Sequence, residues 1–167
     1  MLVNPGVESL PRHLRTVGSW TLRTVDDLPR MRASLEARLR ADCPSAQARG
    51  RDDDGAVLSE SQRIVLVTSE LVANGLEHAV PPITVRLLTD GAAAVLDVVD
   101  GCPEAPPVVP DHRGLGQGGH GLRLAAAVAD RVRWYRTAGE KHVWARFDGS
   151  AAVPGTPPVQ VELDLAK

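Results

Sequence analysis

The polar residues Glu70 and Asn74 stand four positions apart in an otherwise apolar stretch of the chain. On a helix they would share one face, in a narrow stripe that also holds Arg63, Glu77 and His78. Carboxylates and amides are rarely buried without a partner, so this stripe faces either solvent or a ligand. The solvated face of an amphipathic helix is the ordinary interpretation of such a stripe.

Two neighbouring residues in the middle of this stretch favour the ligand. Asn74 is unfavourable inside a helix because its side chain competes for nearby backbone groups. Gly75 costs roughly another 1 kcal/mol relative to alanine. Two unfavourable residues in an otherwise strong helix suggest a local chemical demand. Since the oxygen atoms of Glu70 and Asn74 are ligands that hard cations prefer, this pair is a candidate metal site.

The second candidate site is a glycine-rich segment, residues 114–121, that precedes another helix. Glycine backbone can approach a ligand closely, and the N–H groups at a helix start attract anions such as phosphate. Residues 116–121 fit the spacing GxGxxG, but a dinucleotide-binding fingerprint should follow a strand directly within a βαβ unit. Here a proline-rich segment precedes the glycines, which disfavours a Rossmann site and leaves a plain linker as the alternative.

The order of predicted helices and strands indicates an α+β fold. The patterns predict an edge strand at 14–23, helices at 28–43, 59–80 and 122–130, a hairpin of 83–89 and 92–99 with a two-residue turn at 90–91, and a hairpin of 132–137 and 142–148. Helices separated by hairpins favour a two-layer sandwich, with a mixed or antiparallel sheet and helices on one face. Residues 1–13 are predicted to be a flexible arm and residues 149–167 a tail.

Composition excludes several classes of function. The 167 residues, 43% hydrophobic and 24% charged, are typical of a single globular domain. A net charge of −2 lacks the positive excess that non-specific nucleic-acid binding requires. Cys43 and Cys102 show no zinc-type spacing, which favours a reducing, cytoplasmic compartment. Neither a signal core nor an apolar run of about 18 residues occurs, so we expect no secretion and no membrane span.

Three segments resemble the Bergerat-fold (GHKL) superfamily of ATP-binding proteins, which includes gyrase, histidine kinases and MutL. Residues 70–79, ELVANGLEHA, are similar to the N box of that family. Residues 98–103, VVDGCP, are similar to its first glycine box, and residues 118–122, GGHGL, to its second. The chain is most similar to the small anti-sigma-factor serine kinases and their bacterial, often actinomycete, relatives. The resemblance implies one ATP-binding domain over residues 14–148.

The resemblance also implies roles for individual residues. Asn74 would be the ligand of an Mg²⁺ ion that bridges the phosphates of ATP, and Glu70 the general base that orients a hydroxyl or a water. Asp100 would accept a hydrogen bond from the adenine amino group. The other implied nucleotide-binding residues are Gly101, Gly118, Gly119, His120, Gly121 and Leu122. These residue types suit phosphoryl transfer, which depends on positioning and charge neutralisation.

Three residues depart from the family pattern. Cys102 and Glu104 stand where the first glycine box has glycines, and His142 stands where the last hairpin usually carries a threonine near the adenine-binding aspartate. Two functions therefore remain open. One is a serine/threonine kinase that phosphorylates an anti-sigma antagonist protein and sequesters a sigma factor, with a homodimer as one arrangement. The other is a non-catalytic module that captures a protein partner with weak or no nucleotide binding.

Overall fold

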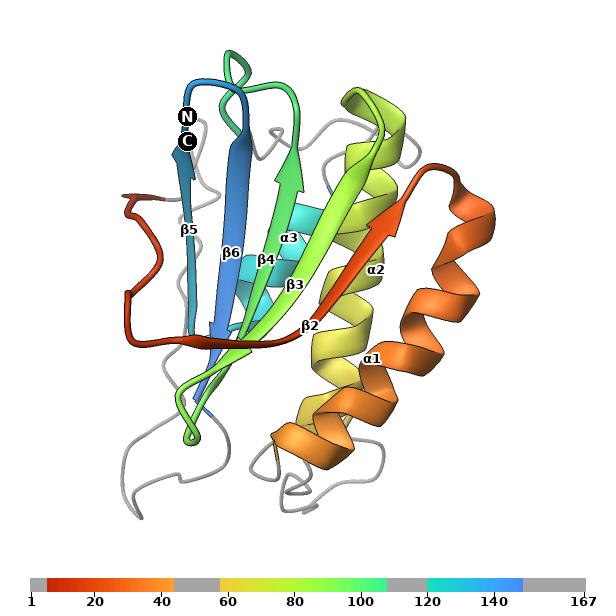
Figure 1. Cartoon of the computed structure of the whole chain (residues 1–167), viewed down its shortest axis with the longest axis vertical. Coiled ribbons are helices and arrows are strands. Elements are labelled where there is room, and N and C mark those ends of the chain that lie inside the picture. The colour runs from red at the N-terminus through yellow and green to blue at the C-terminus, as the bar shows by residue number, and fades with distance from the viewer. Residues whose placement is uncertain (1–5, 44–57, 108–119, 149–167) are drawn as a thin grey trace.

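Figure 1 shows the computed structural model of the chain, which describes residues 6–43, 58–107 and 120–148. These residues form a two-layer α+β sandwich, with a mixed sheet whose one face is covered by helices. The predicted fold class is therefore confirmed. Within the described residues, no helix is both long enough and apolar enough to cross a membrane.

The sheet has the strand order β1-β5-β6-β4-β3-β2. Its strands are β1 (Gly6–Val7), β2 (Arg15–Leu22), β3 (Ile83–Thr89), β4 (Ala94–Asp100), β5 (Arg131–Arg136) and β6 (Lys141–Phe147). Strand β1 pairs with β5 in parallel, and the other neighbouring pairs are antiparallel. Strand β2 lies at one edge and shifts register near its start, as the irregular pattern of this segment predicts. The central position of β4 explains why every residue of that strand is buried.

Three helices cover one face of the sheet in the described part of the chain: α1 (Leu28–Asp42), α2 (Glu60–His78) and α3 (His120–Val128). Helix α1 buries residues spaced three or four positions apart, as predicted. Helix α2 begins with the predicted capping box: the Ser59 hydroxyl accepts from Gln62 N at 3.2 Å, and the Gln62 side chain accepts from Ser59 N at 2.8 Å. This cap fixes where α2 starts, and hence which of its residues face the sheet.

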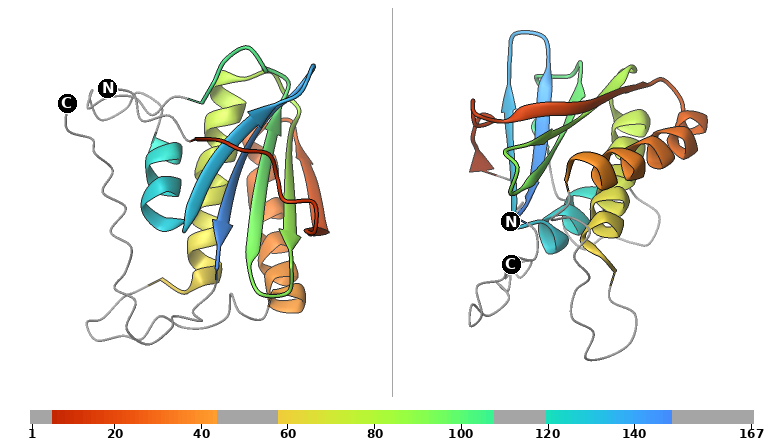
Figure 2. Two further views of the ribbon diagram at one scale, coloured as in Figure 1. Left: turned by 90° about the vertical axis from the view of Figure 1, so that its left-hand side faces the viewer. Right: turned by 60° about the horizontal axis from the view of Figure 1, so that its bottom comes forward.

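The face of the sheet opposite the helices has a smaller core of its own. Leu88, Val95 and Trp144 are buried there, and the segment before β2 crosses over them (Figure 2). Trp144 Nε1 donates to the carbonyl oxygen of Glu8 at 2.7 Å, and Glu8 N donates to the carbonyl oxygen of Trp134 at 3.0 Å. Within the segment predicted to be a flexible arm, residues 6–7 therefore form a strand. A strand of two residues has no periodicity from which it could be predicted.

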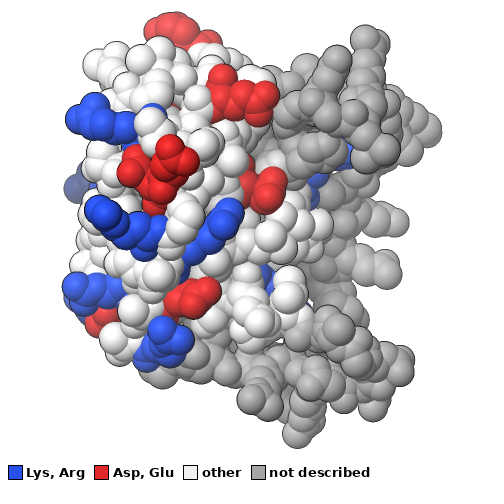
Figure 3. Space-filling model, turned by 90° about the vertical axis from the view of Figure 1, so that its right-hand side faces the viewer, with Lys and Arg blue, Asp and Glu red and all other residues white. Residues whose placement is uncertain are grey.

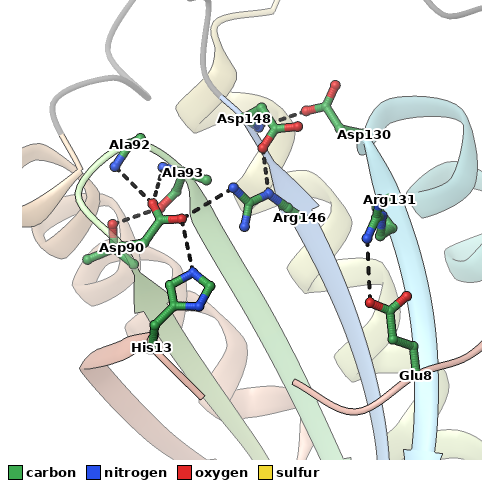
Figure 4. A network of polar contacts seen from close by, with 10 residues as sticks. Glu8, His13, Asp90, Ala92, Ala93, Asp130, Arg131, Arg146 and Asp148 are labelled. Atoms are coloured by element: carbon green, nitrogen blue, oxygen red, sulfur yellow. Dashed lines mark hydrogen bonds and ion pairs between the residues drawn. The ribbon is translucent and has the colours of Figure 1, made fainter. Parts of the chain in front are cut away.

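The turn between β3 and β4 contains four residues, Asp90, Gly91, Ala92 and Ala93, and not the predicted two. The Asp90 carboxylate accepts from the backbone N–H groups of Ala93 at 2.8 Å and Ala92 at 2.9 Å, and lies 3.3 Å from the Arg146 guanidinium (Figure 4). Chiefly because of the two backbone hydrogen bonds, the pKa of Asp90 falls to about 2. The predicted turn residue is thus correct, but its side chain closes a wider loop.

Candidate functional site

A cavity of about 370 Å³ opens between the C-terminal half of α2, the end of β4 and the start of α3. Its volume lies within the range of small-molecule sites. Four polar side chains line it: Asn74, His78, Asp100 and Lys141. The apolar residues on its wall include Leu71, Val98, Leu122 and Val143. An apolar cavity with a few converging polar groups is the usual form of a site for a nucleotide or another small ligand.

Helix α2 supplies Asn74 to the cavity, and the neighbouring Gly75 packs against the start of β3. A Cβ atom added at Gly75 would lie 3.2 Å from Cδ1 of Ile83 at the start of β3. Apart from the adjacent residues and backbone of α2, the atoms nearest to such a Cβ belong to the Ile83 side chain, so a larger residue at position 75 would require that side chain to shift slightly. The neighbouring Asn74 is left half-buried on the cavity wall.

Asp100 is the last residue of β4, and its carboxylate is 9% exposed. One of its oxygens accepts from the backbone N–H of Cys102 at 2.8 Å, and the other lies 3.3 Å from Nζ of Lys141. The Lys141 ammonium also donates to the carbonyl oxygen of Ala105 at 2.9 Å. Lys141 thus joins the end of β4, the loop that follows it and β6. Gly101, in contrast, is exposed and does not line the cavity.

The sequence is similar to that of a known protein family. Residues 21–147, about three quarters of its length, match the family described as the histidine kinase-like ATPase domain. The chain belongs to this family. The crystal structure of the RsbU and RsbW domains of Rv1364c from Mycobacterium tuberculosis is similar, with 19% identity and a TM-score of 0.49. That similarity covers 79% of this chain and 32% of the other, so the chain spans about a third of that protein's length. No curated protein matches the chain.

The ATPase domain brings together residues from all three boxes, but not all of the predicted ones. Asn74, Asp100 and Leu122 line the same cavity. Glu70 is half-buried and lines a different, shallower cavity between α1 and α2, together with Arg32, Glu36 and other residues of those helices. Gly118, Gly119 and the side chain of His120 lie outside the described residues. Their predicted roles, like that of Glu70, stay predictions.

The position of His142 does not agree with its alignment to the family threonine. Its ring lies on the face of the sheet opposite the helices, where Nδ1 is 3.1 Å from an Asp97 oxygen and the ring stacks on Tyr135 with centroids 4.3 Å apart. The flanking residues Lys141 and Val143 face the cavity instead. Side chains alternate along a strand, so the strand period of β6 could have shown that His142 and the cavity residues face opposite ways.

Gly121 is the residue at which α3 meets α2. A Cβ atom added there would lie 2.9 Å from the carbonyl oxygen of Glu70, which is closer than Cβ atoms approach backbone in proteins. Because backbone cannot move aside as a flexible side chain can, only glycine allows this close approach. Gly121 therefore allows the start of α3, and with it Leu122, to lie close against α2.

We expect Gly121→Ala to destabilise the ATPase domain by about 1–3 kcal/mol, since the added methyl group forces α3 away from α2. The free energy of unfolding, measured by urea denaturation, tests this. Gly139→Ala is a matched control, because no atom lies within 4 Å of a Cβ atom at that loop position. Equal stability of the two variants would contradict the close approach of the two helices.

Proposed function

We propose that this ATPase domain binds ATP with Mg²⁺ and acts as a regulatory serine/threonine kinase of a protein partner. The observation that carries the proposal is the meeting of Asn74, Asp100 and Leu122, one residue from each box, on a single cavity. Asp100 at the end of β4 would receive the purine. The phosphates would lie toward Asn74 and the N-terminus of α3, where the first N–H groups of the helix favour anions.

The residues present fit an Mg²⁺ ion that is held mainly by the nucleotide. Asn74 supplies an amide oxygen to the cavity wall, and Mg²⁺ in nucleotide sites keeps several waters and takes few ligands from the protein. In residues 6–43, 58–107 and 120–148, no group of three or more His, Cys, Asp or Glu side chains could hold a metal ion. A metal site independent of nucleotide is therefore disfavoured in this part of the chain, whereas a shared one remains compatible with Asn74.

Glu70 is the proposed general base for attack on the γ-phosphate. It stands one helical turn before Asn74 and opens onto the groove between α1 and α2. A protein hydroxyl that approaches through this groove would have to reach the γ-phosphate directly, since the attacking and leaving oxygens lie roughly in line in phosphoryl transfer. Figure 3 shows acidic and basic side chains interspersed on the α1 side of the molecule. Such a surface suits a protein partner better than nucleic acid, for which a basic patch would be typical.

Two further parts of the proposal come from the family resemblance alone. The partner would be an anti-sigma antagonist protein of a bacterial partner-switching pathway, and the domain would also sequester a sigma factor in the cytoplasm. A homodimer is compatible with this pathway. The second candidate function is a module that captures such a partner without catalysis. It is favoured by the separate positions of Glu70 and Asn74, which line different cavities.

Calorimetric titration with ATP, in the presence and absence of Mg²⁺, tests the nucleotide site. We expect saturable binding that Mg²⁺ strengthens, and we expect Asn74→Ala to weaken Mg²⁺–ATP binding on the order of tenfold, or about 1.4 kcal/mol. The variant should leave metal-free binding almost unchanged. Glu77→Ala is the matched control, because Glu77 is exposed on the same helix.

Two results would contradict this assignment. Absence of binding at millimolar ATP would overturn the kinase proposal and leave the capture module. Equal weakening of ATP binding with and without Mg²⁺ in Asn74→Ala would show that Asn74 shapes the cavity and does not hold the metal.

A further inference from the structure

Lys141 lies at the end of the cavity beside Asp100, and most of its side chain is buried. Its side chain is 12% exposed, and Nζ lies 3.3 Å from a carboxylate oxygen of Asp100. It also donates to the carbonyl oxygen of Ala105 at 2.9 Å. Removing an ammonium from water is costly unless it is paired and hydrogen-bonded, and these two contacts satisfy that need.

The pair of Lys141 and Asp100 keeps hydrogen-bonding capacity beyond the contacts that the two side chains make with the protein. A carboxylate has about four acceptor positions, and two of those of Asp100 are used, by the N–H of Cys102 and by Lys141. An ammonium has three donors, and two of those of Lys141 have partners among the described residues. Both side chains line the cavity. The end of the cavity therefore offers an acceptor and a donor side by side.

Purines differ in what they present to such a pair. Adenine carries an amino donor at its six position, whereas guanine carries a carbonyl acceptor there. A carboxylate alone can accept from the adenine amino group but leaves the guanine oxygen without a donor, and an unpaired buried polar group is penalised. An adjacent ammonium removes that penalty, because it can donate to the six-position oxygen while the carboxylate accepts from the neighbouring ring N–H.

We propose that Lys141 is a specificity-determining residue that lets the cavity accept 6-oxopurine nucleotides as well as adenine nucleotides. The proposal rests on the proposed nucleotide site and names the class of base that this site takes. Lys141 would act by direct contact with the base. A purely structural role, in which Lys141 only ties the loop after β4 to the sheet, would affect all nucleotides to the same extent.

Calorimetric titration of the full chain with ADP, GDP and IDP, each with Mg²⁺, separates the two roles. We expect GDP and IDP to bind the wild-type chain within about tenfold of ADP. Lys141→Met keeps most of the length of the side chain and removes its charge, so it should weaken the binding of GDP and IDP at least tenfold, while the affinity for ADP changes less than threefold. A tenfold loss of affinity corresponds to about 1.4 kcal/mol of binding free energy.

Arg136→Met is the matched control for the loss of one positive charge. Arg136 stands opposite Lys141 in the register of β5 and β6. It is exposed and does not line the cavity. It should leave the ratio of GDP to ADP affinity unchanged. More than tenfold discrimination against both GDP and IDP in the wild type, or an unchanged GDP-to-ADP ratio in Lys141→Met, would overturn the proposal. Binding of ADP alone would overturn only this inference, whereas failure to bind any of the three nucleotides would overturn the nucleotide site as well.

Discussion

Replacing Asp97 with alanine is expected to destabilise the domain by about 3 kcal/mol, at the lower end of what is found when one partner of a buried ion pair is removed. Asp97 lies on β4 with no exposed surface, on the face of the sheet away from the helices. It accepts from the Arg86 guanidinium, with Nε at 3.0 Å, and from the His142 ring at 3.1 Å. Its removal would leave both partners without their acceptor.

The expected loss of stability lies at the lower end of that range because Arg86 keeps contact with water. The Arg86 side chain is 32% exposed, so solvent can compensate part of its lost partner, whereas His142 at 7% cannot be compensated in this way. In the intact protein burial lowers the pKa of Arg86, but the hydrogen bond that Arg86 donates to Asp97, the charge of that carboxylate and the interaction with Tyr135 together outweigh burial, so the pKa is raised. The ion pair of Arg86 and Asp97 therefore holds the positively charged guanidinium in place on the sheet.

Urea unfolding of the Asp97→Ala variant measures the loss of stability, and two further variants show which interaction causes that loss. Asp97→Asn keeps an acceptor of the same shape and should lose less stability than alanine. Asp148→Ala removes the partner of Arg146 at an exposed position, where a pair contributes only about 0.2–1 kcal/mol. A loss in Asp97→Ala no larger than that in Asp148→Ala would contradict the stabilising role of this cluster. Since Asp97 and the cavity lie on opposite faces of the sheet, the folded variant should retain its nucleotide affinity.

The cluster around Asp97 also shows what the sequence could not predict. Asp97 is separated by 11 residues from Arg86 and by 45 from His142. Which residues stand opposite one another depends on the register of β3, β4 and β6, and one slip of register would turn every side chain to the other face. The period of each strand was readable in its own residues, but the register is a property of the assembled sheet.

Local signals predicted the elements well because each is encoded within a few residues. The capping residue Ser59 marks the start of α2, and the apolar spacing of α1 and the alternation of β3 mark their buried faces. Prediction of secondary structure fails where the local signal is short or ambiguous, as for β1 and for the turn that begins at Asp90. The fold class depended only on the order of the elements, so these local errors did not change it.

The residues of the candidate site could be predicted only where they lie within the family motifs. Asn74 and Asp100 meet on one cavity, although 26 positions separate them in the sequence. Lys141 was missed because no motif contains it, and its proposed role depends on the start of β6 lying beside the end of β4. Glu70 and Asn74 share a helix face by spacing, yet they line different cavities, because each cavity is completed by a different neighbouring element.

Replacing Glu70 with glutamine is expected to slow phosphoryl transfer by about 10²–10⁴-fold, the usual contribution of a general base. Glutamine keeps the size and the hydrogen-bonding oxygen of the side chain but cannot take a proton from the attacking hydroxyl. Affinity for ATP should change less than about threefold, since a base acts in the transition state and not in ground-state binding. Single-turnover hydrolysis of ATP, with water as the acceptor, measures the rate without a protein partner.

Glu77→Gln is the control, because it makes the same change at an exposed position two turns further along α2 and should leave the rate unchanged. If Glu70→Gln hydrolyses ATP as fast as the wild type, Glu70 is not the base, and its place in the groove of Arg32 and Glu36 would then indicate a role in partner contact. A wild-type chain that binds ATP without measurable hydrolysis or transfer would favour the capture module. A slow variant with intact ATP affinity would support Glu70 as the base, and it would require that the attacking oxygen reach the γ-phosphate directly, in line with the leaving oxygen.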